Sequence, residues 1–321
     1  MSLSQDIKNK ALESGFDLVG ITDASPVNSE QAGLLSDWLN DGYAADMNYM
    51  HRNFEKRIDP TKLLENAKSV ICVGLNYKPP KHKSTLPHST ELLGKVANYA
   101  QYEDYHPFIK KQLHKLIDFI SSLVEVGHKF KICVDSAPLA ERALAVQAGL
   151  GFIGKNHMLI NPELGPQILL GEIITTLKLS TDKPITTECS NCKKCIDACP
   201  TGALEPNGQF NAGKCISYLT IEHKGRISPE LAEKTGDRLF GCDECTLACP
   251  FQKNAPTCKN KQFKFYPERA KLDLDWILNL NQENFETKFA DSPTKRTGLE
   301  RLKRNARICN ENIKKSSQYS C

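Results

Sequence analysis

The chain has 321 residues and a formal net charge of +4, from 42 Lys and Arg against 38 Asp and Glu. This length allows two domains with cores of ordinary size. No apolar run approaches the roughly 18 residues that a membrane-spanning helix needs, so the sequence predicts no membrane span. The N-terminal residues are polar and do not resemble a secretion signal, so we expect a cytoplasmic protein.

Regular patterns of apolar residues predict alternating strands and helices over the first half of the chain. Runs rich in β-branched residues predict strands at residues 16–22, 69–75, 130–134 and 167–177. Apolar residues at helical spacing predict helices at residues 3–14, 29–41 and 107–126, and a further helix at 138–149 lies between Pro138 and Gly149. This alternation predicts an α/β (α+β) domain over residues 1–180. Cys72 and Cys133 lie in two of the strands and are expected to be inert core residues.

Asp135 comes directly after the predicted strand at residues 130–134. A carboxyl at the mouth of a strand can donate a proton if an apolar setting raises its pKa, and the neighbouring Ala137 and Pro138 suggest such a setting. The alternative is a structural role, because Asp is also a favoured N-cap for the helix that follows. The residues alone leave both roles open.

The segment GFIGKN, at residues 151–156, places two glycines in a loop. Glycine lets a backbone come close to a bound molecule because it has no Cβ atom. We therefore expect this loop to approach a ligand.

Eight cysteines between residues 189 and 249 have the spacing of iron–sulfur ligands. The first run reads C-x2-C-x2-C-x3-C-P, the bacterial ferredoxin pattern, and the second reads C-x2-C-x3-C-P. One cysteine between the runs completes the complement for two [4Fe–4S] clusters. In two-cluster ferredoxins the last cysteine of each run serves the other cluster. We therefore assign one cluster to Cys189, Cys192, Cys195 and Cys249, and the other to Cys199, Cys215, Cys242 and Cys245.

Structural zinc and disulfide bonds are the alternative explanations for these cysteines. A third cysteine at the same interval, followed later by Pro, is poor zinc spacing. Disulfides need an oxidising compartment, which the expected cytoplasmic location does not provide. The pattern therefore predicts a ferredoxin-like domain with two clusters at residues 181–258.

Residues 259–321 form a basic C-terminal segment, with 14 Lys and Arg against 8 Asp and Glu. We expect this segment to be helical and to pack on the first domain, contact a polyanionic partner, or both. A solvated helix face is the alternative explanation of its charge. The basic residues gather at Lys295, Arg296, Arg301, Lys303, Arg304 and Arg307.

Several segments together resemble the epoxyqueuosine reductases, which are cobalamin-dependent iron–sulfur enzymes of tRNA modification. The segments are KRIDP (56–60), YAQYEDYH (99–106), VDSAPLAERALAVQAGLGFIGKN (134–156), the first cysteine run, KCISYLTIEHKG (214–225) and FGCDECTLACP (240–250). The most specific part is D-S-x-P-x-x-E-R followed by G-x-I-G-K-N. The resemblance covers most of residues 50–255.

The resemblance implies reduction of epoxyqueuosine to queuosine at wobble position 34 of tRNAs with a GUN anticodon, the last step of queuosine biosynthesis. It implies that residues 1–180 form a flavin-reductase-like cobalamin-binding domain. It further implies that electrons pass from an external one-electron donor through both clusters to cobalamin. We expect the protein to act as a monomer with no membrane partner.

The same resemblance assigns roles to individual residues. Asp135 matches the family's catalytic acid. The positions that line the family's cobalamin pocket match Arg57, Tyr99, Asn156, Ser217 and Asp243, and His106 is expected to line the same pocket. The positions that contact tRNA match Arg142, His223 and Lys224.

Two other functions stay open from the sequence. One is a corrinoid iron–sulfur reductase of a small molecule, similar to the reductive dehalogenases. The other is a non-catalytic electron-transfer ferredoxin with an added domain. Cobalamin content separates the ferredoxin from the two enzymes, and tRNA binding separates the two enzymes from each other.

Overall fold

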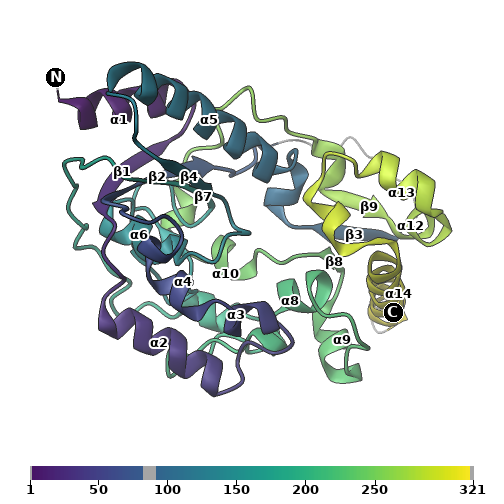
Figure 1. The fold of residues 1–321 in the computed structure, drawn as a ribbon. Helices are drawn as coiled ribbons and strands as arrows, with labels where there is room; N and C mark the ends of the chain where they lie inside the picture. The colour runs from purple at the N-terminus through teal and green to yellow at the C-terminus, as the bar shows by residue number, and fades with distance from the viewer. Residues whose placement is uncertain (1, 82–91, 319–321) are drawn as a thin grey trace. The chain divides into compact units, whose positions relative to one another are not determined.

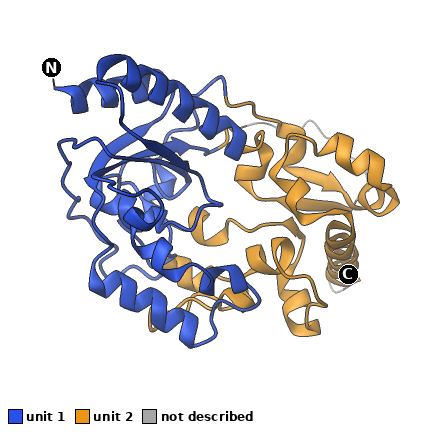
Figure 2. Cartoon of the chain, viewed as in Figure 1, with its two compact units in different colours: residues 1–78, 105–193, 249–262 blue, residues 79–104, 194–248, 263–321 orange. Residues whose placement is uncertain are grey.

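The structure is a computed structural model that describes residues 2–81 and 92–318. The chain divides into two compact units, and each unit is built from separate stretches of the chain (Figure 2). Unit 1 comprises Met1–Lys78, Tyr105–Lys193 and Cys249–Gln262, and unit 2 comprises Pro79–Asp104, Lys194–Ala248 and Phe263–Cys321. The two units are defined by their compactness alone. The three consecutive functional domains expected from the sequence therefore remain a prediction.

An antiparallel sheet forms the centre of unit 1 (Figure 1). Its strands lie in the order β1-β2-β7-β4, and every neighbouring pair is antiparallel. The four strands predicted from the sequence are confirmed, and the antiparallel pairing makes this the α+β form of the predicted class. The strands are β1 (Leu18–Asp23), β2 (Ser69–Asn76), β4 (Phe130–Cys133) and β7 (Ile168–Thr175).

Helix α5 (Tyr105–Leu123) covers one face of this sheet (Figure 1). Its apolar positions Ile109, Leu113, Leu116 and Ile120 are fully buried, as the helical spacing predicts. Gly171 on β7 allows the close approach, because a Cβ atom there would lie 2.6 Å from the Ile109 side chain. The helices α1 (Leu3–Glu13) and α2 (Ser29–Asn40) also form where predicted, and the side chains of Ser2 and Asn28 cap their N-termini.

Helix α6 (Glu141–Gln147) packs on the opposite face of the sheet. The prediction of a helix from Pro138 was wrong at this end, because residues 135–140 form turns and the helix begins at Glu141. Leu144 and Ala145 of α6 share a buried cluster with Cys72 and Cys133, which confirms the prediction that these two cysteines are core residues.

Short elements complete unit 1 around the sheet. A small hairpin joins β5 to β6 as an antiparallel pair, and 3-10 turns connect several segments. The elements are α3 (Asn48–His51), α4 (Phe54–Ile58), β5 (Phe152–Ile153), β6 (Leu159–Ile160) and α11 (Pro250–Lys253).

Unit 2 is organised around a second sheet, in the order β8-β3-β9, and the long helix α14 (Leu299–Gln318). Leu302, Ala306 and Cys309 of α14 are buried in the same core as Leu239 and Phe240 of β8. The end of the basic C-terminal segment, Leu299–Gln318, is therefore helical, as predicted. The other elements are β3 (Leu93–Val96), β8 (Arg238–Phe240), β9 (Lys271–Asp273), α7 (Lys194–Asp197), α8 (Ile216–Ile221), α9 (Pro229–Thr235), α10 (Glu244–Leu247), α12 (Leu274–Asn279) and α13 (Gln282–Lys288). Within residues 2–81 and 92–318, every helix is too short or too polar to cross a membrane.

Candidate active site and cluster ligands

Asp135 occupies a strained turn at the end of β4. Its φ is +53°, in the left-handed region that residues other than glycine seldom adopt. The N–H of Ser136 donates a hydrogen bond to the carbonyl of Val134 at 2.5 Å, so Asp135 is the central residue of a three-residue turn. A turn of this kind with positive φ is costly and persists only when surrounding contacts hold it.

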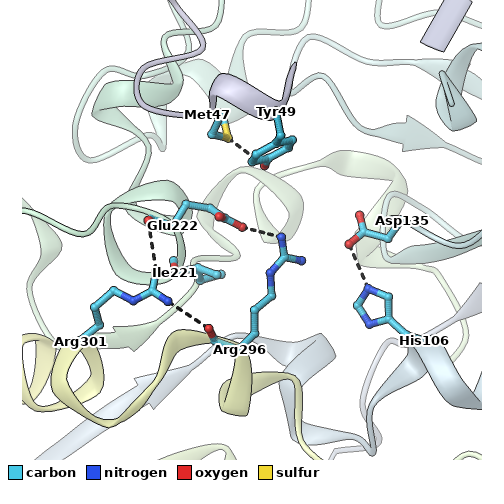
Figure 3. Close-up of polar contacts among 8 residues, drawn as sticks. All are labelled: Met47, Tyr49, His106, Asp135, Ile221, Glu222, Arg296 and Arg301. Carbon is cyan, nitrogen blue, oxygen red and sulfur yellow. Dashed lines mark hydrogen bonds and ion pairs between the residues drawn. The ribbon is translucent and has the colours of Figure 1, made fainter. Parts of the chain in front are cut away.

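The carboxyl of Asp135 contacts His106, which lies in the first turn of α5 (Figure 3). The distance from His106 Nε2 to Asp135 Oδ2 is 3.1 Å, and the Asp135 side chain is 44% exposed. The expected apolar setting is therefore wrong, since the carboxyl has a polar partner and access to solvent. The capping alternative is also wrong, because Ala140 is the N-cap of α6 and no side chain caps that helix.

Two glutamates lie close to the Asp135 turn, and neither was predicted to have a functional role. Oε1 of Glu141 accepts the backbone N–H of Asp135 at 2.5 Å. Glu172 lies in the middle of β7 and is fully buried, and no N–H group of the described residues donates to its carboxyl oxygens. Its side chain shares a hydrogen bond with the carboxyl of Glu141. A single charged residue within the apolar strand Ile168–Thr175 was the signal that could have identified it.

Burial raises the pKa of both glutamates. The pKa of Glu141 is raised to about 7, first by burial and then by the charge of Asp135. Burial also raises the pKa of Glu172 well above its usual range, and the charge of Glu141 adds to this effect. The two carboxyls therefore share at least one proton near neutral pH.

Two arginines lie close to the same carboxyls. Arg57 on α4 is half-buried, and burial lowers its pKa while the charges of Tyr49, Glu141 and Asp135 act in the opposite direction. Its Nε atom is buried and has no partner among the described residues. Arg142 is exposed, and its guanidinium donates to the carbonyl of His157. Unit 1 thus brings together Asp135 and the arginines predicted to contact cobalamin and tRNA.

The glycines of the 151–156 loop have a structural explanation that the sequence did not predict. A Cβ atom on Gly151 would lie 2.4 Å from the carbonyl oxygen of Ile160, and one on Gly154 would lie 2.2 Å from the Ile160 side chain. The space is filled by protein, so close packing of the β5–β6 hairpin requires these glycines. Asn156 is buried, and its side-chain oxygen accepts the N–H of Met158 at 3.2 Å. Within unit 1, the Lys155 ammonium group donates to the carbonyls of Ser190 (2.7 Å) and Cys192 (3.0 Å).

The other three residues predicted to bind cobalamin lie in neighbouring segments of unit 2. The carboxylate of Asp243 accepts the N–H of Asn98 at 2.7 Å, and burial raises the pKa of Asp243 to about 6. Tyr99 follows Asn98 in the chain, and its ring lies 6.0 Å from the Phe240 ring. Ser217 is in α8, the helix whose Thr220 hydroxyl accepts the N–H of Gly241 at 2.9 Å.

The predicted cluster ligands fall into two neighbourhoods. In unit 2, burial and then the charges of Cys215, Cys242 and, more weakly, Cys199 raise the pKa of Cys245 well above its usual range. In unit 1, Cys249 is within electrostatic range of Cys189 and Cys192. Cys195 is buried at the start of the unit 2 segment, on α7.

The chemistry of these thiols fits iron–sulfur clusters. All cysteines in the described part of the chain are free, so disulfides do not explain the pattern there. No three His, Cys, Asp or Glu side chains of the described residues converge on a single metal ion. In a [4Fe–4S] cluster each cysteine sulfur binds a different iron atom, so the four cysteines do not have to converge on one point. Burial and mutual repulsion raise the pKa of these thiols, and the positive irons of a cluster would stabilise their thiolate form.

The candidate tRNA residues His223 and Lys224 lie in a loop that α14 supports. Lys224 is exposed, and the His223 ring nitrogen lies 3.1 Å from the carbonyl of Arg226. Arg304 donates to the carbonyls of His223 at 2.8 Å and Gly225 at 2.7 Å. The loop that follows α8 is thus fixed by an arginine of the C-terminal helix.

Other members of the basic cluster also make contacts within unit 2. Arg301 donates to the carbonyls of Ile221 and Arg296, and Arg296 pairs with Glu222 at 2.8 Å (Figure 3). Lys295 pairs with Glu286 at 2.8 Å. A purely solvated helix face, the alternative considered from the sequence, does not describe these residues.

Comparisons with known proteins agree with this arrangement. The family model described as epoxyqueuosine reductase QueG, DUF1730, matches residues 57–136, and a model for a 4Fe-4S double cluster binding domain matches residues 188–252. The epoxyqueuosine reductase of Leadbetterella byssophila is 41% identical over 310 residues, which cover 96% of this chain and 98% of the relative. That of Pseudomonas aeruginosa is 37% identical over 95% of this chain and 84% of the relative.

Solved structures give the same result. A crystal structure of an epoxyqueuosine reductase with an epoxyqueuosine-modified tRNA-Tyr stem loop has a TM-score of 0.90 and 34% identity, and the match covers 98% of this chain and 82% of that one. The Bacillus subtilis enzyme, with its catalytic aspartate loop swung out of the active site, has a TM-score of 0.89, 34% identity and the same coverage. Similarity of this extent in sequence and fold shows that the chain belongs to the epoxyqueuosine reductase family.

Proposed function

We propose that this chain reduces epoxyqueuosine to queuosine at wobble position 34 of tRNAs with a GUN anticodon. The observation that carries the proposal is Asp135, an acid in a left-handed turn, 3.1 Å from His106 and inside the range matched by the epoxyqueuosine reductase model. The related structure that holds an epoxyqueuosine-modified tRNA stem loop adds support.

Removal of the epoxide oxygen as water consumes two electrons and two protons and leaves an alkene. Asp135 gives a proton to the departing oxygen, because its partly exposed carboxyl can reach a substrate. Nε2 of His106 holds this carboxyl in place and can return a proton to it after the transfer. Asp135 is the catalytic residue of this proposal, and His106 is its positioning partner.

When bound, cobalamin supplies the reducing power for the epoxide, and two [4Fe–4S] clusters deliver single electrons from an external donor. The buried and unpaired Nε of Arg57 supports this fit, since it offers a donor to a polar group that the described residues do not supply. The fold of unit 1 would then be the flavin-reductase-like cobalamin domain. The residues that would hold cobalamin are Arg57, Tyr99, Asn156, Ser217 and Asp243.

The cysteines that would hold the clusters keep the crossed assignment. Support comes from the mutual electrostatic influence of the thiols around Cys245 and around Cys249, and from the match to a double cluster binding domain. One cluster would take Cys189, Cys192, Cys195 and Cys249, and the other Cys199, Cys215, Cys242 and Cys245.

The substrate tRNA would be held by Arg142, His223 and Lys224 through contacts to its phosphates. The modified base has to leave the stack to reach an acid on the protein, as enzymes that act on bases generally require. We propose that the protein works in the cytoplasm as a monomer.

The test is anaerobic incubation of the protein with tRNA that carries epoxyqueuosine, with added cobalamin and a chemical reductant. We expect queuosine among the nucleosides after digestion, in excess over the protein, and none when cobalamin is omitted. A small-molecule reductase would retain cobalamin but leave the tRNA unchanged. A non-catalytic ferredoxin would retain iron but no cobalamin.

A further inference from the structure

Glu172 is a buried acid in a place where an apolar residue would serve the fold better. On β7 it lies directly opposite Cys72 of β2 and Cys133 of β4, in the middle of the sheet. It is fully buried, no N–H group of the described residues donates to either carboxyl oxygen, and its side chain shares a hydrogen bond with the carboxyl of Glu141. Burial of a carboxylate without an N–H donor and beside a second carboxyl is costly, so the side chain carries a proton.

Glu141 is the group that acts on Glu172 most strongly after burial itself. It is the first residue of α6, the helix that packs on the same face of the sheet as Cys72 and Cys133. Its Oε1 accepts the N–H of Asp135, the residue with the positive φ. The buried acid, the helix start and the strained turn therefore form one connected set.

We propose that Glu141 is a positioning residue that holds the Asp135 turn through its backbone N–H, and that Glu172 orients Glu141 from within the sheet. The hydroxyl of Glu172 donates to one carboxyl oxygen of Glu141, while the other oxygen accepts from Asp135. The inference rests on the proposed function, in which Asp135 is the proton donor. It explains how a strained turn is kept in one conformation.

A purely structural role for Glu172 makes a different prediction. If the side chain only fills space, an unbranched apolar residue of similar length should replace it without harm or with a gain in stability. If it orients Glu141, the replacement must keep a hydrogen-bond donor. Gln has the shape of protonated Glu and carries an N–H donor, so Glu172→Gln and Glu172→Met separate the two roles.

The experiment measures two quantities for the reconstituted protein under anaerobic conditions. One is hydrogen–deuterium exchange of peptides that contain residues 134–137, and the other is single-turnover conversion of epoxyqueuosine-tRNA with pre-reduced cobalamin. We expect Glu172→Met and Glu141→Ala to speed the exchange and to slow conversion by roughly tenfold to a hundredfold, the effect of a misplaced catalytic group. Glu172→Gln should restore both quantities to nearly the wild-type values.

Cys133→Ala is the matched control, because Cys133 lies opposite Glu172 in the same sheet but is not a member of the proposed chain of hydrogen bonds. It should leave exchange and conversion unchanged, and an effect equal to that of Glu172→Met would overturn the inference as general loosening of the sheet. Equal behaviour of Glu172→Gln and Glu172→Met would also overturn it. If Glu172→Met fails to fold, Glu141→Ala still tests the proposal. Exchange of residues 134–137 at the wild-type rate in Glu141→Ala would contradict it. If the wild-type protein does not convert the tRNA, the proposed function fails, while the exchange data still test the role of Glu141.

Discussion

At the scale of single residues, Asp135 differs from an ordinary surface aspartate in its backbone conformation and in its hydrogen-bond partners. Its φ of +53° is one that Asn and Asp tolerate better than most residues. Its side chain contacts His106, and its N–H contacts Glu141. These contacts fix a carboxyl that is still 44% exposed, which is the condition for proton transfer to an external substrate.

Asp135→Asn separates proton transfer from scaffolding. Asn keeps the size of the side chain and its tolerance of the left-handed region, but it has no proton to transfer. Conversion of epoxyqueuosine-tRNA in a single turnover with pre-reduced cobalamin should fall by roughly 10²-fold or more. Iron content, cobalamin binding and tRNA affinity should stay at wild-type values. Conversion close to wild type would show that Asp135 is not the acid.

The buried acid pair predicts how stability depends on pH. In the unfolded chain a glutamate has a pKa of about 4.3, whereas burial in the folded protein raises the pKa of Glu141 to about 7 and raises the pKa of Glu172 well above its usual range. The folded state therefore holds more protons, so the contribution of the pair is full below the unfolded pKa and is lost as pH rises towards the folded values. Asp135, Arg57 and Arg142 are the other charged groups that act on the pair.

Glu172→Gln removes the buried ionisable group and should flatten this dependence. Comparison of thermal unfolding midpoints of the two proteins from pH 5 to pH 8 isolates the effect from other carboxyls. The unfolding midpoint of the variant should rise relative to that of the wild type as pH rises, because only the wild type must keep a proton on Glu172. A difference that is constant across this range would contradict the assignment of a protonated acid.

At the scale of elements, the spacing of apolar residues along the chain predicted the helices and strands that form from neighbouring residues. The apolar spacing of residues 107–126 defines a face that packs on the sheet, and the β-branched runs at 69–75 and 167–177 define its buried strands. The start of α6 was missed because contacts from distant residues hold the turn before it. The contact between His106 and Asp135 was also not predicted, because the two residues are 29 positions apart in the sequence. Composition showed the charge of the C-terminal helix but not the carbonyls that its arginines bind.

Arg304 provides a test of the structural role of helix α14. Its guanidinium donates to the carbonyls of Leu219, His223 and Gly225, which end α8 and begin the next loop. Arg304→Met keeps the apolar stem and removes these donors, so stability should fall by about 2 kcal/mol, the range for charged hydrogen bonds. The measurement is the thermal unfolding midpoint together with the rate of proteolysis near residue 224.

The exposed Arg307 on the same helix is the control for Arg304. Arg307→Met removes the same charge without removing contacts to the α8 loop, so it should leave the unfolding midpoint nearly unchanged. If both variants weakened tRNA binding equally and neither changed stability, the basic helix would act on the tRNA through its charge alone.

At the scale of the whole molecule, the boundaries between the compact units fall inside both cysteine runs. Cys192 and Cys195 belong to different units, as do Cys245 and Cys249. The spacing of the cysteines revealed the cluster chemistry, because converging thiolates require short fixed intervals. The interleaving of the chain could not be predicted, since it depends on contacts among segments that are far apart in sequence.

The cluster assigned to Cys199, Cys215, Cys242 and Cys245 has all its ligands in unit 2, which makes a selective prediction possible. Anaerobically purified protein should hold about eight iron atoms per chain, the content of two cubanes. Cys215→Ala removes one ligand of this set and should lower the content to about four, with loss of one EPR signal. Cys309→Ala is the matched control, because Cys309 is a buried cysteine of the same unit that lies in the apolar core. Its iron content and both EPR signals should equal those of the wild type. Unchanged iron and unchanged signals in Cys215→Ala would refute the crossed assignment, since the other seven of the eight assigned cysteines would then have to hold both clusters.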